Sequence, residues 1–157
     1  MKFKLLIAVV GFILGSALPV SQSLALTHID GLVPYEDIDA AEIPVLQSPK
    51  TSLGKDFNYP TGQPLIKAYV IDIPVGKQTS LHKHAVPLFV YVVSGELEVD
   101  YGSKGKKSFK SGTSYIEEID WCHFGKPAGK IPVRIIGIYL GQVNPDQVKP
   151  EPCTKPN

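Results

Sequence analysis

The sequence predicts a single all-β domain, built as a sandwich or barrel of short strands. Runs of β-branched, aliphatic and aromatic residues recur at a spacing of roughly ten residues, with glycine-containing turns between them. The 14 prolines are spread along the chain, and no stretch keeps the apolar period of an amphipathic helix, which argues against long helices. The length of 157 residues fits one such domain.

The first 25 residues are predicted to be a cleaved export signal rather than part of this domain. Lys2 and Lys4 precede an apolar run from Leu5 to Leu14, and Ser23-Leu24-Ala25 offers a small-x-small cleavage site. The apolar run is about half of the roughly 20 residues that a membrane-spanning helix needs. We therefore expect cleavage after Ala25, no stable membrane insertion of the mature protein, and a periplasmic or secreted location.

Five later runs are predicted to be strands. They comprise residues 65–73, 88–93, 96–101, 113–116 and 132–140. Ser94-Gly95 is predicted to form a tight hairpin turn between the second and third of these runs, and 102–105 and 110–112 to form further turns.

The distribution of proline, glycine and aspartate divides the chain further. Residues 26–63 have a less regular pattern and are interpreted as an N-terminal arm with the first strands. Residues 64–141 form the predicted barrel. Residues 142–157 form a proline-rich C-terminal tail, which we expect to be extended and poorly packed.

The charge of the mature chain gives no reason to expect nucleic acid or anionic lipid as a partner. Removing residues 1–25 removes two lysines and no acidic residue, so 14 Lys and Arg remain against 15 Asp and Glu, for a net charge of about −1. The lysines at 104, 106, 107 and 110 are interpreted as a solvated strand, or as an edge strand protected from pairing.

Three histidines lie within the predicted β region and are candidate metal ligands. His82 and His84 are two residues apart, so both imidazoles lie on one face of a strand. Neutral imidazole is the commonest protein ligand for transition metals. The third, His123, lies further along the chain. By itself, a His-x-His pair is a weak indication of a metal site.

The residues around these histidines resemble the two cupin motifs. Gly76-x5-His82-x-His84-x3-Leu88-x6-Gly95 matches the spacing of the first, Gly-x5-His-x-His-x3-4-Glu-x6-Gly. Gly112, His123 and Pro127 have the spacing of the first, histidine and last positions of the second motif, Gly-x5-Pro-x-Gly-x2-His-x3-Asn. The resemblance covers about residues 65 to 140 and implies a single-domain cupin, that is, an all-β jelly-roll β-barrel.

The sequence departs from these motifs at several positions. Leu88 stands in place of the glutamate of the first motif, and Glu118, Asp120 and Pro127 replace Pro, Gly and Asn of the second. Cupins typically use the histidines and the glutamate to hold one divalent metal. The resemblance therefore implies a site for Fe, Mn, Ni, Cu or Zn at His82, His84 and His123, completed by another carboxylate or left with three histidines.

Glu117 is the best candidate for that carboxylate. The chain also resembles a bacterial single-domain cupin subgroup with the pattern H-x-H-x-x-P, Y-V-x-x-G-E-L, G-x-x-[FY]-x-E and a later H. Here the pattern includes Pro87, Tyr91, Gly112, Tyr115 and Glu117. Residues 113, 115 and 117 share a face of a strand. If that face is inward, Glu117 points toward His123, as a ligand or as a base; the alternative is a solvated carboxylate beside Glu118 and Asp120.

Three histidines leave coordination positions open, which is typical of a catalytic rather than a structural ion. The first hypothesis is a metal-dependent small-molecule enzyme, dioxygenase-like or related, with Glu117 and Tyr91 as further catalytic candidates. The alternatives are a non-enzymatic exported binding protein for a small ligand or metal complex, and a metal-free structural cupin. Cupins often dimerise, and a homodimer remains open. The aromatic candidates for the pocket wall are Phe89, Tyr91, Trp121, Phe124 and Tyr139.

The chain has two cysteines, Cys122 and Cys153. In an oxidising compartment such a pair indicates a disulfide. If His123 faces inward, Cys122 faces outward, where a disulfide to Cys153 would pin the C-terminal tail across the barrel. The competing interpretation is a free, redox-active Cys122 beside His123.

Overall fold

The computed structural model describes residues 48–143 and 148–154. The predicted signal peptide and the arm up to residue 47 lie outside this part of the chain, so their roles stay predictions. The strands are β1 (Pro64–Ile73), β2 (His82–Lys83), β3 (Leu88–Ser94), β4 (Glu96–Asp100), β5 (Lys106–Lys110), β6 (Ser114–Ile116), β7 (Phe124–Pro127), β8 (Val133–Gln142) and β9 (Glu151–Pro152). A 3-10 turn, η1 (Gly102–Lys104), is the one helical element of the described residues, and no helix among them is long and apolar enough to cross a membrane.

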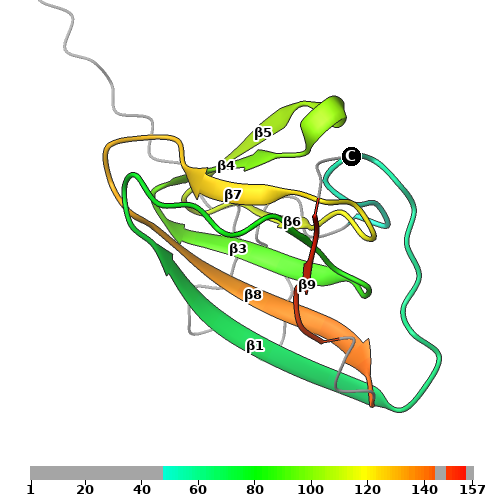
Figure 1. Cartoon of the computed structure of the whole chain (residues 1–157). Coiled ribbons are helices and arrows are strands. Elements are labelled where there is room, and N and C mark those ends of the chain that lie inside the picture. Colours follow the sequence, from blue (N-terminus) through cyan, green and yellow to red (C-terminus); the bar gives the residue numbers. More distant parts are fainter. Residues whose placement is uncertain (1–47, 144–147, 155–157) are drawn as a thin grey trace, which may run out of the picture.

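Two antiparallel sheets face each other and enclose the core (Figure 1). One has the order β1-β8-β3-β6 and the other the order β5-β4-β7. Alternate residues of β8 point into the space between the sheets, so that Val133, Ile135 and Tyr139 are buried while their neighbours are more exposed. Val90 and Val92 of β3 and Leu97 and Val99 of β4 meet them in one apolar cluster. The prediction of an all-β barrel is confirmed.

The predicted hairpin at Ser94-Gly95 is wrong. β3 pairs with β6 and β8, whereas β4 pairs with β5 and β7, so the chain passes from one sheet to the other at this point. Gly95 has a φ of +81°, and a Cβ on it would lie 2.5 Å from the carbonyl oxygen of Pro132. The glycine is therefore needed for a close crossing beside another loop, not for a two-residue hairpin.

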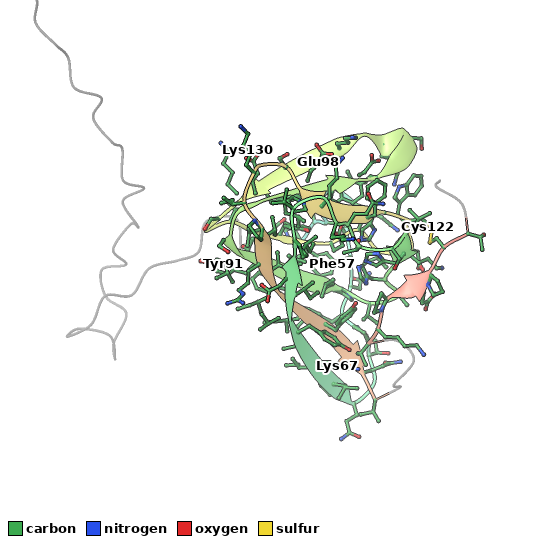
Figure 2. The ribbon with its side chains drawn as sticks, turned by 60° about the vertical axis from the view of Figure 1, so that its left-hand side comes forward. Phe57, Lys67, Tyr91, Glu98, Cys122 and Lys130 are labelled. Carbon is green, nitrogen blue, oxygen red and sulfur yellow. A yellow bond between two sulfur atoms is a disulfide. The ribbon has the colours of Figure 1, made fainter. Side chains whose placement is uncertain are left out.

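The lysine-rich segment is the edge strand β5, as one of the two interpretations predicted. It is joined to β4 by the predicted turn at 102–105, which contains η1. Glu98 lies on the outer side of this sheet (Figure 2). Lys106 and Lys126 both form ion pairs with it. The sequence analysis missed β7, which pairs with the other side of β4, because a strand containing Gly, Lys and Pro shows no apolar alternation.

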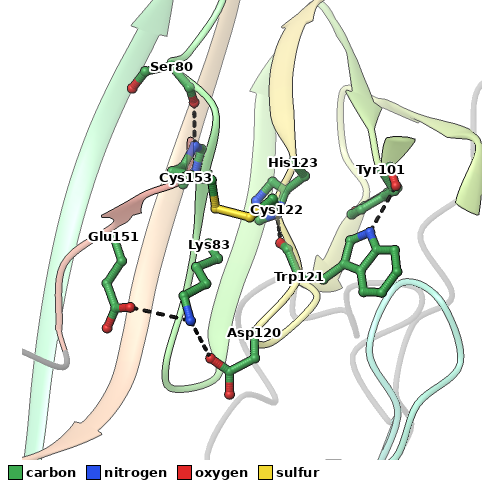
Figure 3. Close-up of a disulfide and its surroundings, with 10 residues drawn as sticks. Ser80, Lys83, Tyr101, Asp120, Trp121, Cys122, His123, Glu151 and Cys153 are labelled. Carbon is green, nitrogen blue, oxygen red and sulfur yellow. Dashed lines mark hydrogen bonds and ion pairs between the residues drawn. A yellow bond between two sulfur atoms is a disulfide. The ribbon is translucent and has the colours of Figure 1, made fainter. Parts of the chain in front are cut away.

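The expectation of a poorly packed C-terminal tail agrees with the exposure of residues 149, 150, 152 and 154, but it is wrong for Val148. Val148 is only 2% exposed and belongs to the core cluster. It packs so closely against β8 that a Cβ on Gly141 would lie 2.4 Å from Val148 Cγ1. Further on, β9 pairs with β2, and the predicted Cys122–Cys153 disulfide is present (Figure 3). The prolines limit the tail to two ladder residues, but they do not prevent burial of its apolar side chain.

Candidate metal centre

Two segments far apart in sequence bring the three histidines together. His82 and His123 face each other across an antiparallel bridge, in which each backbone N–H donates to the other residue's carbonyl, at 3.0 and 2.8 Å. His84 follows β2 directly, with its ring centroid 4.9 Å from that of His82. One nitrogen from each of the three imidazoles lies within 4.8 Å of the others, and His84 and His123 are buried. The residues predicted to lie together therefore do so.

Hydrogen bonds at Nδ1 fix the orientation of two of these rings. His82 Nδ1 donates to the carbonyl oxygen of Ser80 at 2.6 Å. His123 Nδ1 donates to that of Trp121 at 2.8 Å (Figure 3). Because a carbonyl oxygen can only accept, the proton of each neutral ring must be on Nδ1. The lone pair of Nε2 is then free, which is the arrangement found in metal-binding histidines.

His84 has a different partner. Its Nδ1 lies 3.1 Å from the hydroxyl oxygen of Tyr139, whose ring packs edge-on against the imidazole. Burial lowers the pKa of His84 well below its ordinary value of 6.5, and the neighbouring His123 and His82 lower it further. Burial also lowers the pKa of His82. The neutral form of His82 and His84, which is the form that can bind a metal, is therefore favoured.

Glu117 lies just after β6 and is only 4% exposed. Its Oε2 is 3.6 Å from His123 Nε2, so the inward orientation is observed and the solvated alternative is excluded. Tyr101 donates a hydrogen bond to Oε1 at 2.7 Å, Tyr115 donates to Oε2 at 3.2 Å, and the Glu118 N–H donates to Oε1 at 2.8 Å. Burial and the charge of Glu117 raise the pKa of Tyr101 and of Tyr115, which keeps both hydroxyls as donors. Glu117 is thus held in one orientation.

The position of Glu117 also explains the departure at Leu88. The Glu117 N–H donates to the Leu88 carbonyl at 2.8 Å, so the two residues are neighbours across the β3–β6 ladder. Leu88 itself is buried and lines the cavity. A carboxylate therefore lies across the ladder from Leu88, just after the adjacent strand β6, and both side chains line the cavity.

Glu118 and Asp120, the acidic residues that follow Glu117 in the sequence, have other contacts. Glu118 is buried with its side chain away from the histidines, where Oε2 accepts a hydrogen bond from Thr51 at 2.6 Å. Asp120 is largely exposed and pairs with Lys83 at 3.3 Å (Figure 3). Neither residue lines the cavity that contains Glu117.

This cavity has a volume of about 250 Å³ and lies between the two sheets. The three histidines, Glu117, Thr79 and Ser80 are among its polar lining residues, and aliphatic residues of β1, β3, β4 and β8 form much of the remainder. Of the five aromatic residues predicted for its wall, Tyr139 lines it and the other four do not. Tyr69 and Tyr115 line it instead, although the sequence analysis did not propose them for the wall.

The parity of β3 explains the main error in the aromatic prediction. Leu88 and Val90 face the cavity, so Phe89 and Tyr91 face the other side of the sheet. The suggestion that Tyr91 is a catalytic group is therefore wrong (Figure 2). Trp121 lies outside the cavity as well, where its Nε1 donates to the Tyr101 carbonyl and Lys104 Nζ lies 3.5 Å from its ring centroid.

Two facing antiparallel sheets enclose a histidine triad that could hold a metal ion. The chain has a cupin fold. No family model matches the sequence, and no curated protein matches it either.

Solved cupin structures are similar over about half of the chain. They include the formate complex of the Lactobacillus farciminis oxalate decarboxylase, at 22% identity and a TM-score of 0.45 over 50% of this chain and 25% of that one. An RmlC-like cupin from Methanocaldococcus jannaschii is 12% identical, with a TM-score of 0.46 over 49% and 71%. The DMSP lyase DddQ from Ruegeria pomeroyi is 18% identical, with a TM-score of 0.48 over 59% and 44%. The chain spans a quarter of the decarboxylase and less than half of the lyase, and these likenesses concern the fold alone.

Proposed function

We propose that this protein is an exported cupin that holds one divalent transition metal at His82, His84 and His123, with Glu117 beside it, and acts on a small molecule in a dioxygenase-like or related reaction. The observation that carries this proposal is the orientation of the imidazoles. The Nδ1 atoms of His82 and His123 are bound to backbone carbonyls, which leaves their Nε2 atoms free inside the barrel.

The donor set fits a transition metal. Imidazole nitrogens bind such metals at about 2.0–2.1 Å and carboxylate oxygens at about 2.0–2.2 Å, so two ligands of one ion lie roughly 3.0–3.4 Å apart. The separation of 3.6 Å between Glu117 Oε2 and His123 Nε2 is close to that range. A metal bound here would supply Lewis acidity and, if redox-active, a route for reaction with dioxygen.

The protein's own residues would orient the ligand and move a proton. Glu117 Oε1 already accepts hydrogen bonds from Tyr101 and from a backbone N–H, whereas Oε2 accepts only the longer bond from Tyr115. Oε2 is therefore the oxygen that would bind the metal or take a proton from a substrate. The aliphatic wall of the cavity would exclude water from the reacting atoms.

The proposal of export is supported by the disulfide. Disulfides persist in oxidising compartments and are rare in the cytosol. The Cys122–Cys153 bond thus agrees with the signal peptide predicted at residues 1–25.

Metal analysis tests the proposal directly. The mature protein is purified without chelator, offered Fe, Mn, Ni, Cu or Zn in turn, dialysed and analysed. We expect close to one equivalent of at least one metal, and none in the double variant His82→Ala/His84→Ala. Lys83→Ala is the matched control, because Lys83 lies between these histidines but pairs outward with Asp120 and Glu151. A wild-type protein that stays empty with all five metals contradicts the proposal, and metal retention without turnover of any substrate would favour a binding protein.

A further inference from the structure

The sheet β1-β8-β3-β6 has an outer face, turned away from the cavity, that is the basis of a second proposal. We infer that this face is a docking surface for residues 26–47 of the same chain, which precede the described part. The inference goes beyond the proposed function and does not depend on it, because the face shares no residue with the metal centre.

The outer face of this sheet is apolar, like the inner one. Side chains alternate along each strand, so the outward residues are the neighbours of those that line the cavity. They pair across all four strands in two rows. One row is Ala68, Ile138, Phe89 and Ile116, and the next is Val70, Ile136, Tyr91 and Ser114. Strands that read as continuous apolar runs are typical of sheets that are covered on both faces.

Several residues of this face lack a covering partner. Ile66 and Val70 on β1 are 68% and 66% exposed. At the opposite border, Ser114 on β6 is buried, yet its hydroxyl has no hydrogen-bond partner among residues 48–143 and 148–154. A contiguous apolar surface with an unsatisfied hydroxyl at its border indicates that another segment of protein packs there.

The described chain begins at the β6 edge of this face. Ser48 lies with Ser114 and Ile116 around a groove beside β6, and the Ser52 N–H donates to the Ile116 carbonyl at 2.7 Å. Residues 26–47 therefore start from this edge of the sheet. Four strands spaced by about 4.8 Å span about 14 Å, which about five extended residues cross at roughly 3.3 Å each. A segment of 22 residues is long enough to cover the face.

The composition of residues 26–47 matches this surface. Nine of these 22 residues are Leu, Ile, Val or Tyr, and Ile43, Val45 and Leu46 lie next to the groove in sequence. The segment has five Asp and Glu and no Lys or Arg, whereas residues 48–157 have 14 Lys and Arg against 10 Asp and Glu. Lys50, Lys107 and Lys110 line the groove where the segment starts. Apolar contact and opposite charge thus act together.

Covalent attachment favours this segment over a second copy of the chain. A segment joined directly to the edge of its binding surface has an effective concentration in the mM range, without any partner in solution. A second copy would have to bind beside residues 26–47, which start from the same edge. We therefore assign the face to residues 26–47 of the same molecule.

Cleavage by a glutamate-specific protease tests the inference, because the segment contains Glu42. A docked segment is cut only in the fraction of molecules in which it has left the face. Ile138→Asp places a charge at the centre of the face and should accelerate cleavage of the mature protein after Glu42 by at least about tenfold. Ile131→Asp is the matched control, since Ile131 is 60% exposed and lies outside the sheet, and it should be cut at the wild-type rate.

A second pair of variants covers the case in which Ile138→Asp does not fold, as judged by circular dichroism. Val70 is already 66% exposed, so Val70→Asp should fold and still accelerate cleavage by about threefold. Val75→Asp is its control, because Val75 is 50% exposed and follows β1. Equal rates for wild type and the folded face variants would overturn the inference.

The oligomeric state identifies the occupant of the face. We expect a monomer in sedimentation, with a cleavage rate that does not change with protein concentration. A dimer that Val70→Asp dissociates would place a second copy on the face and overturn the inference. Cleavage that slows as the protein concentration rises would also overturn it, because the segment would then dock on a neighbouring molecule.

Discussion

At the scale of single residues, Glu117 decides whether the histidine cluster has a carboxylate partner. Glu117→Gln preserves the size of the side chain and an oxygen that can accept from Tyr101 and the Glu118 N–H. It removes the negative charge 3.6 Å from His123 Nε2. We therefore expect metal affinity to fall by at least about tenfold, as is common when a ligand or its close partner is lost. Titration of metal-free protein with a competing chelator measures this change.

Glu96→Gln is the matched control for this substitution. Glu96 begins β4, is not part of the cavity wall, and its side chain has no hydrogen bond or ion pair with residues 48–143 or 148–154. The same loss of charge should leave metal affinity unchanged there. Equal and negligible effects of both substitutions would mean that the site consists of three histidines, with Glu117 serving only to position Tyr101 and Tyr115.

At the scale of elements, the passage from β3 to β4 through Gly95 separates the two sheets. We predict that Gly95→Ala destabilises the protein by about 2 kcal/mol or more, because the new Cβ meets the Pro132 carbonyl oxygen at 2.5 Å in a backbone with φ of +81°. Urea unfolding measures the loss. Gly112→Ala is the control, since its φ is +83° but nothing lies within 4 Å of its Cβ. If both variants lose the same stability, backbone strain alone acts and the close crossing contributes nothing.

Across the whole molecule, the disulfide ties the C-terminal tail to the strand region that carries the histidines. Cys122 directly precedes His123. β9 ends directly before Cys153 and pairs with β2, the strand that contains His82. The sequence separation is 31 residues. The chain-entropy model gives about 3–4 kcal/mol for closing such a loop.

We predict that a reductant lowers the melting temperature of the wild-type protein and weakens metal retention, because the tail then holds β2 less firmly. The double variant Cys122→Ser/Cys153→Ser should have the lower melting temperature from the start and not respond to reductant. Intact mass with alkylation before and after reduction establishes the thiol count. Two alkylated cysteines in the folded, unreduced protein would contradict the disulfide and restore the interpretation of a free Cys122.

Local patterns were sufficient for most of the strands and for the histidines. β1, β3, β4, β6 and β8 begin and end within two residues of the predicted runs, because burial of one face leaves an alternating apolar pattern in the sequence. His82, His84 and His123 could be selected because their spacing matches a known pair of motifs. β7 and β9 have no such pattern, and pairing with β4 and β2 places them.

The sequence by itself determined the all-β class and the histidine triad, and it favoured a disulfide between its two cysteines, which the structure contains. Only the tertiary structure decided that the chain changes sheets at Gly95, that Glu117 stands across the ladder from Leu88, and that Val148 closes the core. The physical reason is the range of the interactions. Alternation and motif spacing are properties of neighbouring residues, whereas a counter-charge, a close crossing or a buried tail residue depends on which distant segment lies opposite, and that is settled when the sheets pair and pack.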